Sequence, residues 1–352
     1  MTIAMTPLLQ YHQHQGFPLT ASGEAVVTFG NDADISQDFS NGCLLYDQSH
    51  WGLLNFTGAD RQRYLHNQST NQIQQLQSGQ SCDTVLVNST ARTIDLATVH
   101  ILDDALWVQV SPQKKTFLLE WFDRFLFPMD KVEISDLSGQ FNILSLMGVQ
   151  AKEILEKLTG VTLADFPAGG HQFLEIQGQN ILCATGNSLK LPGYTLYIPA
   201  EAGVEIWQAL MNLGMIPCGE AAWEKLRIHQ GRPAPDQELT EDYNPLEAGL
   251  WDCISFDKGC YIGQETIARL NTYKGVKQRL FGIQLSAPVA VPCKIFVGEE
   301  RAGVITSIDP DNTFALGYVR TKVGGEELEV TVGEVTGKVV AVPYVTHAYP
   351  EP

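Results

Sequence analysis

The feature that most constrains the fold is a change in the spacing of apolar residues near residue 276. Before it, strand-like runs alternate with segments whose apolar residues recur at helical spacing, as in residues 115–127. After it, short β-rich runs are separated by turn signals such as the Asp-Pro-Asp-Asn sequence at 309–312. We therefore expect an α+β body over residues 1–275 and a small all-β barrel or sandwich over residues 276–352.

The expected elements of the body follow one another as strand, helix, strands and helix, and this style then repeats. That order is typical of ferredoxin-like α+β modules. We expect strands at 44–58, 83–89, 93–102, 105–110, 140–148, 172–184 and 194–199 and helices at 60–76, 115–127, 150–159, 202–213 and 219–230. Asp60 is the expected N-cap of the first of these helices.

The net charge of −17 sets the expected partners. An acidic chain repels nucleic acid and anionic membranes unless a local basic patch overrides the global field, so neither is an expected partner. No apolar run approaches the 18 or so residues that a membrane span needs. Because the first Lys or Arg is Arg61, neither a secretory signal nor a transit peptide fits, and we expect a cytoplasmic protein.

The seven cysteines are predicted to be reduced thiols. Their number is odd, and no Cys-x-x-Cys pair occurs among them. Disulfide frameworks belong mainly to small secreted chains, so most of these side chains are expected to be small buried hydrophobes.

One cysteine stands out by its neighbours. Gly259 and Gly263 bracket Cys260, so the backbone can turn tightly there and expose the thiol. A helix is expected to begin at residue 264, and Lys258 lies two residues before the thiol. Both features would lower the pKa of Cys260 and make it a better nucleophile, redox group or metal ligand. The alternative is an inert, buried cysteine in a tight loop.

The same region is locally basic. It carries a single acid, Glu265, and five cations, which gives a local charge of +4. The cations are Lys258, Arg269, Lys274, Lys277 and Arg279. A solvated charged face and a site for an anionic ligand both explain such a run. The patch is too small, and too poor in aromatic residues, for a nucleic-acid groove.

The segment KGCYIGQE at 258–265 resembles the defining motif of the YgfZ family, the folate-binding, Fe–S-maintenance branch of the glycine-cleavage T-protein superfamily. Residues 46–73, 191–201 and 219–250 resemble the opening, the central strand and the helix-turn segment of that superfamily. Residues 272–282, TYKGVKQRLFG, look closest to the cyanobacterial and chloroplast versions.

The resemblance implies a T-protein-like ring of ferredoxin-like α+β subdomains around a central folate cavity, with a C-terminal β-barrel. Tetrahydrofolate or a one-carbon derivative is the implied cofactor. The implied folate contacts are Trp51, Trp223, Arg227, Tyr194 and Asp95. Core packing is the alternative role for the two tryptophans, and an ion pair with Glu224 is the alternative for the arginine.

The resemblance also implies that Cys260, with Lys258, supports Fe–S enzymes, including radical-SAM tRNA-modifying enzymes. The implied protein partners are Fe–S client or assembly proteins that bind transiently, and no resident metal site is expected. One cysteine cannot hold a cluster alone.

A second hypothesis is a folate-dependent aminomethyltransferase, and a third is a folate-binding scaffold without chemistry. Amine chemistry needs a carboxylate. Residues 184–193, where T-proteins carry a folate-contacting Glu, contain no acid. Asp95 is therefore the single candidate carboxylate, and this departure favours the first hypothesis.

Overall fold

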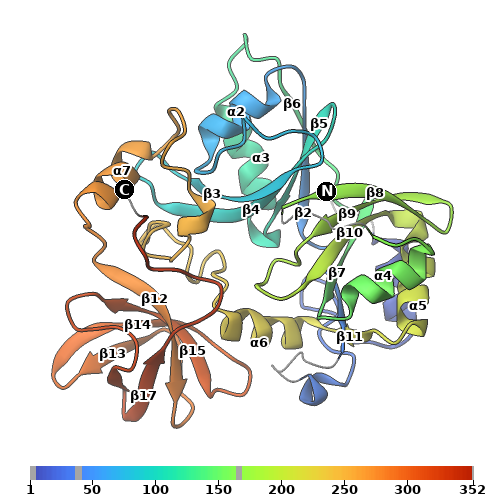
Figure 1. Cartoon of the computed structure of the whole chain (residues 1–352). Coiled ribbons are helices and arrows are strands. Elements are labelled where there is room, and N and C mark those ends of the chain that lie inside the picture. Colours follow the sequence, from blue (N-terminus) through green and yellow to red (C-terminus); the bar gives the residue numbers. More distant parts are fainter. Residues whose placement is uncertain (1–4, 36–41, 164–168, 351–352) are drawn as a thin grey trace. The chain divides into compact units, whose positions relative to one another are not determined.

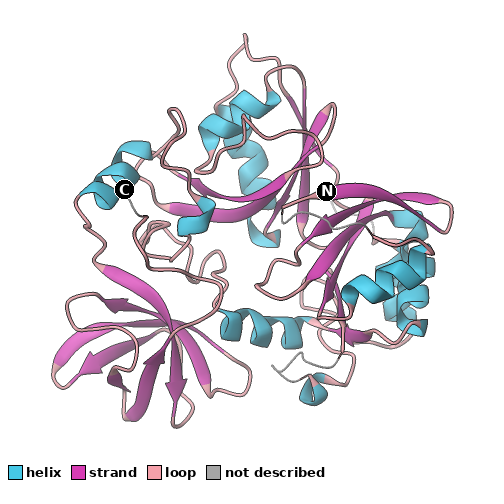
Figure 2. Ribbon diagram, in the orientation of Figure 1, coloured by secondary structure: helices cyan, strands magenta, loops and turns pink. Residues whose placement is uncertain are grey.

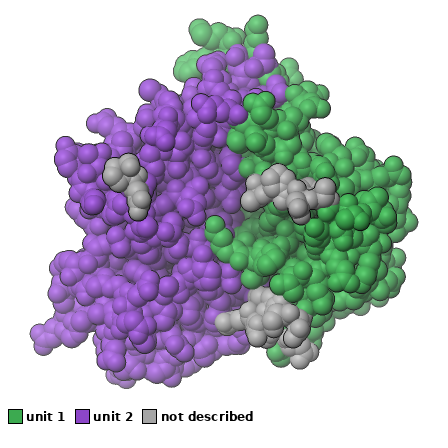
Figure 3. All heavy atoms as spheres, viewed as in Figure 1, with its two compact units in different colours: residues 1–58, 76–81, 99–223 green, residues 59–75, 82–98, 224–352 purple. Residues whose placement is uncertain are grey.

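The structure is a computed structural model that describes residues 5–35, 42–163 and 169–350. The chain divides into two compact units, which Figure 3 colours separately. Unit 1 comprises residues 1–58, 76–81 and 99–223, and unit 2 comprises residues 59–75, 82–98 and 224–352. Unit 2 thus combines the C-terminal barrel with segments from the first hundred residues. The domain boundary between residues 275 and 276 stays a prediction.

Unit 1 is built on a six-stranded mixed sheet with the strand order β11-β1-β7-β10-β9-β8 (Figure 1). β1 pairs in parallel with β11 and antiparallel with β7. β1 and β7 lie inside the sheet and are mostly buried. The strands are β1 Leu44–Asp47, β7 Phe141–Met147, β8 His171–Ile176, β9 Gln179–Thr185, β10 Gly193–Pro199 and β11 Ile216–Cys218.

Three helices of unit 1 pack beside this sheet: α1 Pro7–His14, α4 Ala151–Thr159 and α5 Gly203–Asn212 (Figure 2). α4 contacts β8 and β10 through the apolar face that carries Ile154 and Leu155. It ends at Gly160, which adopts the left-handed conformation that favours glycine after a helix. The short 3₁₀ helices of this unit are η1 Asp32–Asp34, η2 Pro112–Lys114 and η3 Ala200–Ala202.

A second group of strands in unit 1 consists of β2 Gly52–Thr57, β5 Ala105–Val110 and β6 Glu133–Asp136, with β2 between the other two. α3 Lys115–Arg124 contacts β2 and β6 and buries Leu118 and Phe122. The predicted helix over 115–127 is therefore confirmed except for its last three residues.

Unit 2 contains a closed six-stranded barrel with the order β12-β15-β14-β13-β16-β17, which confirms the predicted C-terminal β module (Figure 1). Its interior is filled by alternate apolar side chains such as Ile283, Ile295 and Val319. The strands are β12 Gln278–Leu285, β13 Cys293–Val297, β14 Glu300–Ile308, β15 Phe314–Arg320, β16 Glu329–Val332 and β17 Val335–Val340.

Unit 2 also holds α2, α7, η4 and most of β3 and β4, and the division between the units falls within α6. These elements are α2 Arg61–Gln68, β3 Ser81–Val87, β4 Thr93–Ile101, α6 Glu220–Gln230, η4 Trp251–Cys253 and α7 Gln264–Thr272. The predicted helix at 219–230 is confirmed as α6.

Four local predictions were wrong. The run expected as one strand over 44–58 is two strands, β1 and β2, which residues 48–51 separate. The helix expected over 60–76 ends at Gln68. Asp60 precedes it without a side-chain capping hydrogen bond, and its carboxylate lies 3.5 Å from Nη2 of Arg63. The run expected as one strand over 172–184 is the hairpin β8–β9, because Gln177 and Gly178 take positive φ values and form a tight turn.

Candidate functional site

The KGCYIGQE segment begins with a loop over residues 258–263, the motif loop, which leads into α7. Lys258 anchors this loop at the C-terminal end of α2. Its ammonium donates hydrogen bonds to the backbone carbonyls of His66 at 2.6 Å and of Ser69 and Asn71 at 2.7 Å. The carbonyls at the end of a helix lack partners within the helix and carry partial negative charge, so a cation is favoured there.

Two further hydrogen bonds complete the cap on α2. The backbone N–H of Ile262 donates to the carbonyl of Asn67 at 3.0 Å, and the hydroxyl of Ser69 donates to the carbonyl of Leu65 at 2.9 Å. The motif loop thus donates hydrogen bonds to carbonyls at the end of α2. If the helix continued, the next backbone N–H groups of the helix would bond to these carbonyls instead. This explains why α2 stops at Gln68 although the apolar pattern predicted a longer helix.

Lys258 is 5 % exposed and lies 4.7 Å from the ring centroid of Tyr261. Burial lowers the pKa of Lys258 to about 7, and the three carbonyls use all three N–H donors of the ammonium. The sequence suggested that Lys258 belongs to a basic surface patch, but this side chain is buried and does not belong to one. Its role beside Cys260 in the chemistry stays a prediction.

Cys260 is the exposed thiol among the seven cysteines, none of which forms a disulfide in the described structure. By contrast, burial raises the pKa of the Cys43 and Cys183 thiols to about 12, which keeps them protonated. The prediction of reduced, mostly buried cysteines is thus confirmed. The motif loop exposes one thiol while its neighbours Lys258 and Tyr261 are buried.

The two glycines of the motif loop differ in their importance for its geometry. Gly263 has a φ of +79°, and a Cβ there would meet the carbonyl oxygen of Asn88 at 2.8 Å and Cα of Ala91 at 3.0 Å. Only glycine fits that position without movement of the backbone. Gly259 lacks a positive φ and has open space around its Cα. The tight turn predicted around Cys260 therefore depends on Gly263.

Two predicted folate contacts come together in unit 1. Trp51 and Trp223 meet edge to face, with ring centroids 5.6 Å apart and an interplanar angle of 84°. Tyr46, which the sequence analysis did not select, stacks on Trp223 at 5.3 Å and 15°. We call these three residues the aromatic cluster. The sequence pointed to Tyr46 only through its position in the predicted strand that also contains Trp51.

The edge of the aromatic cluster is polar. The hydroxyl of Tyr46 donates to Glu220, and burial together with the carboxylate of Glu220 raises the pKa of Tyr46 well above its usual value. The indole N–H of Trp223 is buried and has no hydrogen-bond partner among the described residues. Such a donor costs free energy unless a ligand or water accepts from it. A planar heterocycle with ring nitrogens or a carbonyl oxygen, such as a pteridine, fits that requirement.

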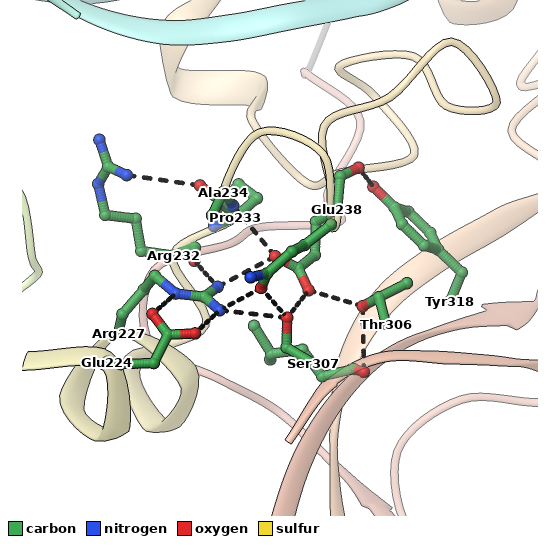
Figure 4. Close-up of polar contacts among 11 residues, drawn as sticks. Glu224, Arg227, Arg232, Pro233, Ala234, Glu238, Thr306, Ser307 and Tyr318 are labelled. Carbon is green, nitrogen blue, oxygen red and sulfur yellow. Dashed lines mark hydrogen bonds and ion pairs between the residues drawn. The ribbon is translucent and has the colours of Figure 1, made fainter. Parts of the chain in front are cut away.

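Arg227, on the unit 2 part of α6, is fully buried at the centre of a polar network (Figure 4). Its guanidinium donates to the carboxylate of Glu224, to that of Glu238 at 3.0 Å and to the carbonyl of Arg232 at 2.9 Å. Further bonds reach Gln237 at 2.7 Å and Ser307 at 3.1 Å. The alternative predicted for Arg227, an ion pair with Glu224, is confirmed.

This Arg227 network leaves the guanidinium little capacity for a ligand, because its Nε and both terminal nitrogens already have acceptors. Burial acts to lower the pKa of Arg227, but the carboxylates of Glu238 and Glu224 more than offset it. Glu238 also accepts from the hydroxyl of Thr306 at 2.6 Å, which ties the segment after α6 to the barrel (Figure 4). A direct contact of Arg227 with folate stays a prediction.

The remaining predicted residues lie on strands. Asp95 on β4 is fully buried, and its Oδ1 accepts a hydrogen bond from the backbone N–H of Leu96 at 2.9 Å. Tyr194 on β10 is half-buried. Unit 1 holds Trp51, Tyr194 and Trp223, and unit 2 holds Asp95, Arg227, Lys258 and Cys260.

An α+β body joined to a closed six-stranded barrel is the fold of aminomethyltransferase T. The crystal structure of that glycine cleavage system protein from Bartonella henselae matches with a TM-score of 0.83 and covers 99% of this chain and 100% of the solved one. At 20% sequence identity this match establishes the fold alone. The family model of the GCVT N-terminal domain matches residues 28–258, and the chain belongs to that family.

Two relatives extend the similarity over most of the chain. The chloroplastic "Putative transferase" of Arabidopsis thaliana is 42% identical over 330 residues, which cover 92% of this chain and 76% of that protein. An aminomethyltransferase of Halothermothrix orenii is 28% identical over 361 residues, which cover 97% and 99% of the two chains. The glycine-cleavage T-protein superfamily predicted from the motifs is thus confirmed.

Within the described residues, none of the helices is both long and apolar enough to cross a membrane.

Proposed function

We propose that this protein binds tetrahydrofolate or a one-carbon derivative and supports the assembly or repair of Fe–S clusters in client enzymes, as a member of the YgfZ branch of its superfamily. The observation that carries the proposal is the exposure of Cys260 in a loop whose other side chains are anchored. Lys258 caps α2, Tyr261 packs in the core and Gly263 is fixed by its backbone conformation. Cys260 is left as the residue of this loop that can meet a partner.

The chemistry of a thiol suits this role. Fe–S clusters are held by cysteine thiolates, and a single thiolate can ligate iron while a client protein supplies the other ligands. The proposed partners are therefore Fe–S client or assembly proteins that bind transiently. Cytoplasmic localisation also stays a proposal.

Folate binding is proposed to involve the aromatic cluster. Trp51 and Trp223 are buried against each other, at 4 % and 6 % exposure, and the unpaired N–H of Trp223 suits an acceptor on the pteridine. When bound, the folate would carry the one-carbon unit. Tyr194 is the further aromatic candidate from unit 1, and Asp95 is the candidate carboxylate. The central folate cavity of the superfamily remains part of this proposal.

The second candidate function is a folate-dependent aminomethyltransferase. The similarity to the aminomethyltransferase of Halothermothrix orenii over nearly the whole chain favours it. It needs a carboxylate that assists the amine, and Asp95 is the candidate. The missing acid in residues 184–193 argues against it.

Complementation separates these functions. In a strain that lacks this gene and shows an Fe–S-enzyme defect, Cys260→Ala should fail to restore the enzyme. The control variant is Cys293→Ala, which removes a half-buried thiol of the barrel and should restore the enzyme. Full rescue by Cys260→Ala would remove the proposed role of the thiol. Turnover of the aminomethylated carrier protein of glycine cleavage by the purified protein would favour the transferase instead.

Folate binding is tested separately through the intrinsic fluorescence of the tryptophans. Tetrahydrofolate should quench it, and Trp223→Phe, which removes the unpaired N–H but keeps an aromatic ring, should weaken binding. Unchanged affinity in both Trp223→Phe and Trp51→Phe would show that the folate site lies elsewhere.

A further inference from the structure

A cavity of about 690 Å³ in unit 2 gathers cations from segments that are far apart in the sequence. We call it the basic cavity. Its cationic lining residues are Arg92, Lys274, Lys277, Arg320 and Lys322. They face two acids, Asp242 and Glu247. The whole chain has 23 Lys and Arg residues against 40 Asp and Glu residues, so such a local excess of cations runs against the charge of the protein.

Backbone hydrogen bonds fix the walls of the basic cavity. The N–H of Thr321 donates to the carbonyl of Lys277 at 2.9 Å, and its hydroxyl reaches the carbonyl of Val276 at 3.2 Å. Gln278 pairs with Arg320 across β12 and β15. These bonds hold the segment before β12 against the end of β15, so the two basic runs remain adjacent.

The turn after α7 forms another part of the wall. Lys274 adopts a φ of +49°, and the N–H of Gly275 donates to the carbonyl of Leu270 at 2.9 Å, which closes the helix. Arg92 is held from the other side by the carbonyl of Asp242, which its Nη1 contacts at 2.8 Å. The backbone positions of these cationic residues are thus fixed, which keeps the cations close to one another.

The cations of the basic cavity are incompletely neutralised. Lys322 pairs with Glu300, whereas Lys274 and Lys277 form no ion pair among the residues that the structure describes. Glu247 is 7 % exposed, and burial raises the pKa of its carboxyl, although the nearby Arg92 and Lys277 act to lower it. A ligand with several negative charges would satisfy these cations together.

We propose that the basic cavity binds an oligophosphate group, either free or at the end of a larger molecule. The volume lies in the range of small-molecule sites. Lysine ammoniums act as point charges for phosphate oxygens, and arginine forks bind two of them at once. The cavity lining contains no aromatic residue on which a nucleobase could stack, so recognition rests on the phosphates. This site is independent of the proposed folate site.

Calorimetric titration of the full-length protein with tripolyphosphate in 50 mM KCl tests the proposal. We expect saturable binding that weakens as salt rises. Lys277→Gln and Arg320→Gln should each weaken it at least fivefold. Lys294→Gln, which removes one exposed cation from β13 outside the cavity, should leave it within twofold. Thermal unfolding of each variant confirms that it is folded.

The remaining arms identify the source of the ligand. ATP and tripolyphosphate with similar affinity would support recognition of the phosphates. No binding at 1 mM tripolyphosphate, or equal loss in the Lys294→Gln control, would overturn the proposal. A hexaglutamate peptide that binds more tightly than tripolyphosphate would overturn it in favour of an acidic protein partner. Displacement of tripolyphosphate by tetrahydrofolate would overturn the proposal and assign the basic cavity to the folate site.

Discussion

The Arg227 network allows a sharp test of whether this arginine stabilises the fold or binds a ligand. The side chains of Arg227 and Glu238 are both fully buried, and Nη1 of Arg227 lies 3.0 Å from Oε2 of Glu238. Arg227→Met keeps most of the side-chain volume but leaves the Glu238 carboxylate buried without its counter-ion. Breaking a buried ion pair in this way costs about 3–5 kcal/mol. We therefore expect the free energy of unfolding to fall by that amount.

Arg227→Lys should be nearly as damaging. The guanidinium reaches Glu224 with one side and Gln237 and Glu238 with the other, whereas an ammonium is a single point of charge. Lys338→Met is the matched control, because its ion pair with Glu327 is exposed and such pairs contribute little.

The loss should depend on pH. In Arg227→Met the Glu238 carboxylate is buried without a counter-ion, and this costs free energy only while the carboxylate is charged. The destabilisation should therefore be larger at pH 7 than under acidic conditions that protonate the carboxylate. Adding Glu238→Gln to Arg227→Met should recover part of the stability at pH 7.

Urea unfolding at pH 7 and pH 4.5, followed by tryptophan fluorescence, measures these changes. A loss below about 1 kcal/mol for Arg227→Met would refute the structural argument, because a broken buried pair costs more. If Arg227→Lys kept its normal stability but bound tetrahydrofolate more weakly, Arg227 would instead be assigned to the folate site.

Three further predictions concern the motif loop and the buried imidazole of His100. Gly263→Ala should lower the free energy of unfolding by about 1–2 kcal/mol or more, because alanine resists a positive φ and its Cβ would meet Ala91, while Gly259→Ala should change it little; equal effects in urea unfolding would contradict this. Lys258→Met should lower the free energy of unfolding by about 1–3 kcal/mol, since it leaves buried carbonyls without their donor, and should speed thiol labelling of Cys260; an unchanged labelling rate would show that Lys258 does not hold the loop. Burial lowers the pKa of His100 to about 3 from 6.5, so its neutral form is favoured in the folded state, and its contribution is full above pH 6.5 and declines by about 1.4 kcal/mol per unit below it; His100→Gln should flatten the acid limb of the stability–pH curve, and an unaltered limb would exclude this contribution.

Much of the fold could be predicted from residue patterns. The predicted bounds of α4, α5 and α6 matched the helices within one residue at each end, and α4 and α5 bury an apolar face. The short alternating runs after residue 276 predicted the barrel. The prediction missed the end of α2, because a lysine 190 residues away in the sequence supplies the cap.

The candidate site was predicted less completely. Cys260 was selected as an exposed thiol, and it is exposed. Lys258 was selected as its cationic neighbour, but its ammonium faces the carbonyls of α2. Tyr46 and Glu238 were missed, because each gains its role through a contact with a residue distant in the sequence. Side-chain direction across such distances leaves no periodic signal.

The sequence by itself determined most of the helices and strands, the family and the loop that carries Cys260, because local apolar spacing and short motifs are properties of neighbouring residues. The tertiary structure decided what each side chain of that loop contacts, how Arg227 is satisfied and where cations converge into the basic cavity. Those outcomes depend on packing between distant segments, where burial makes each unpaired polar group costly and so selects its partner.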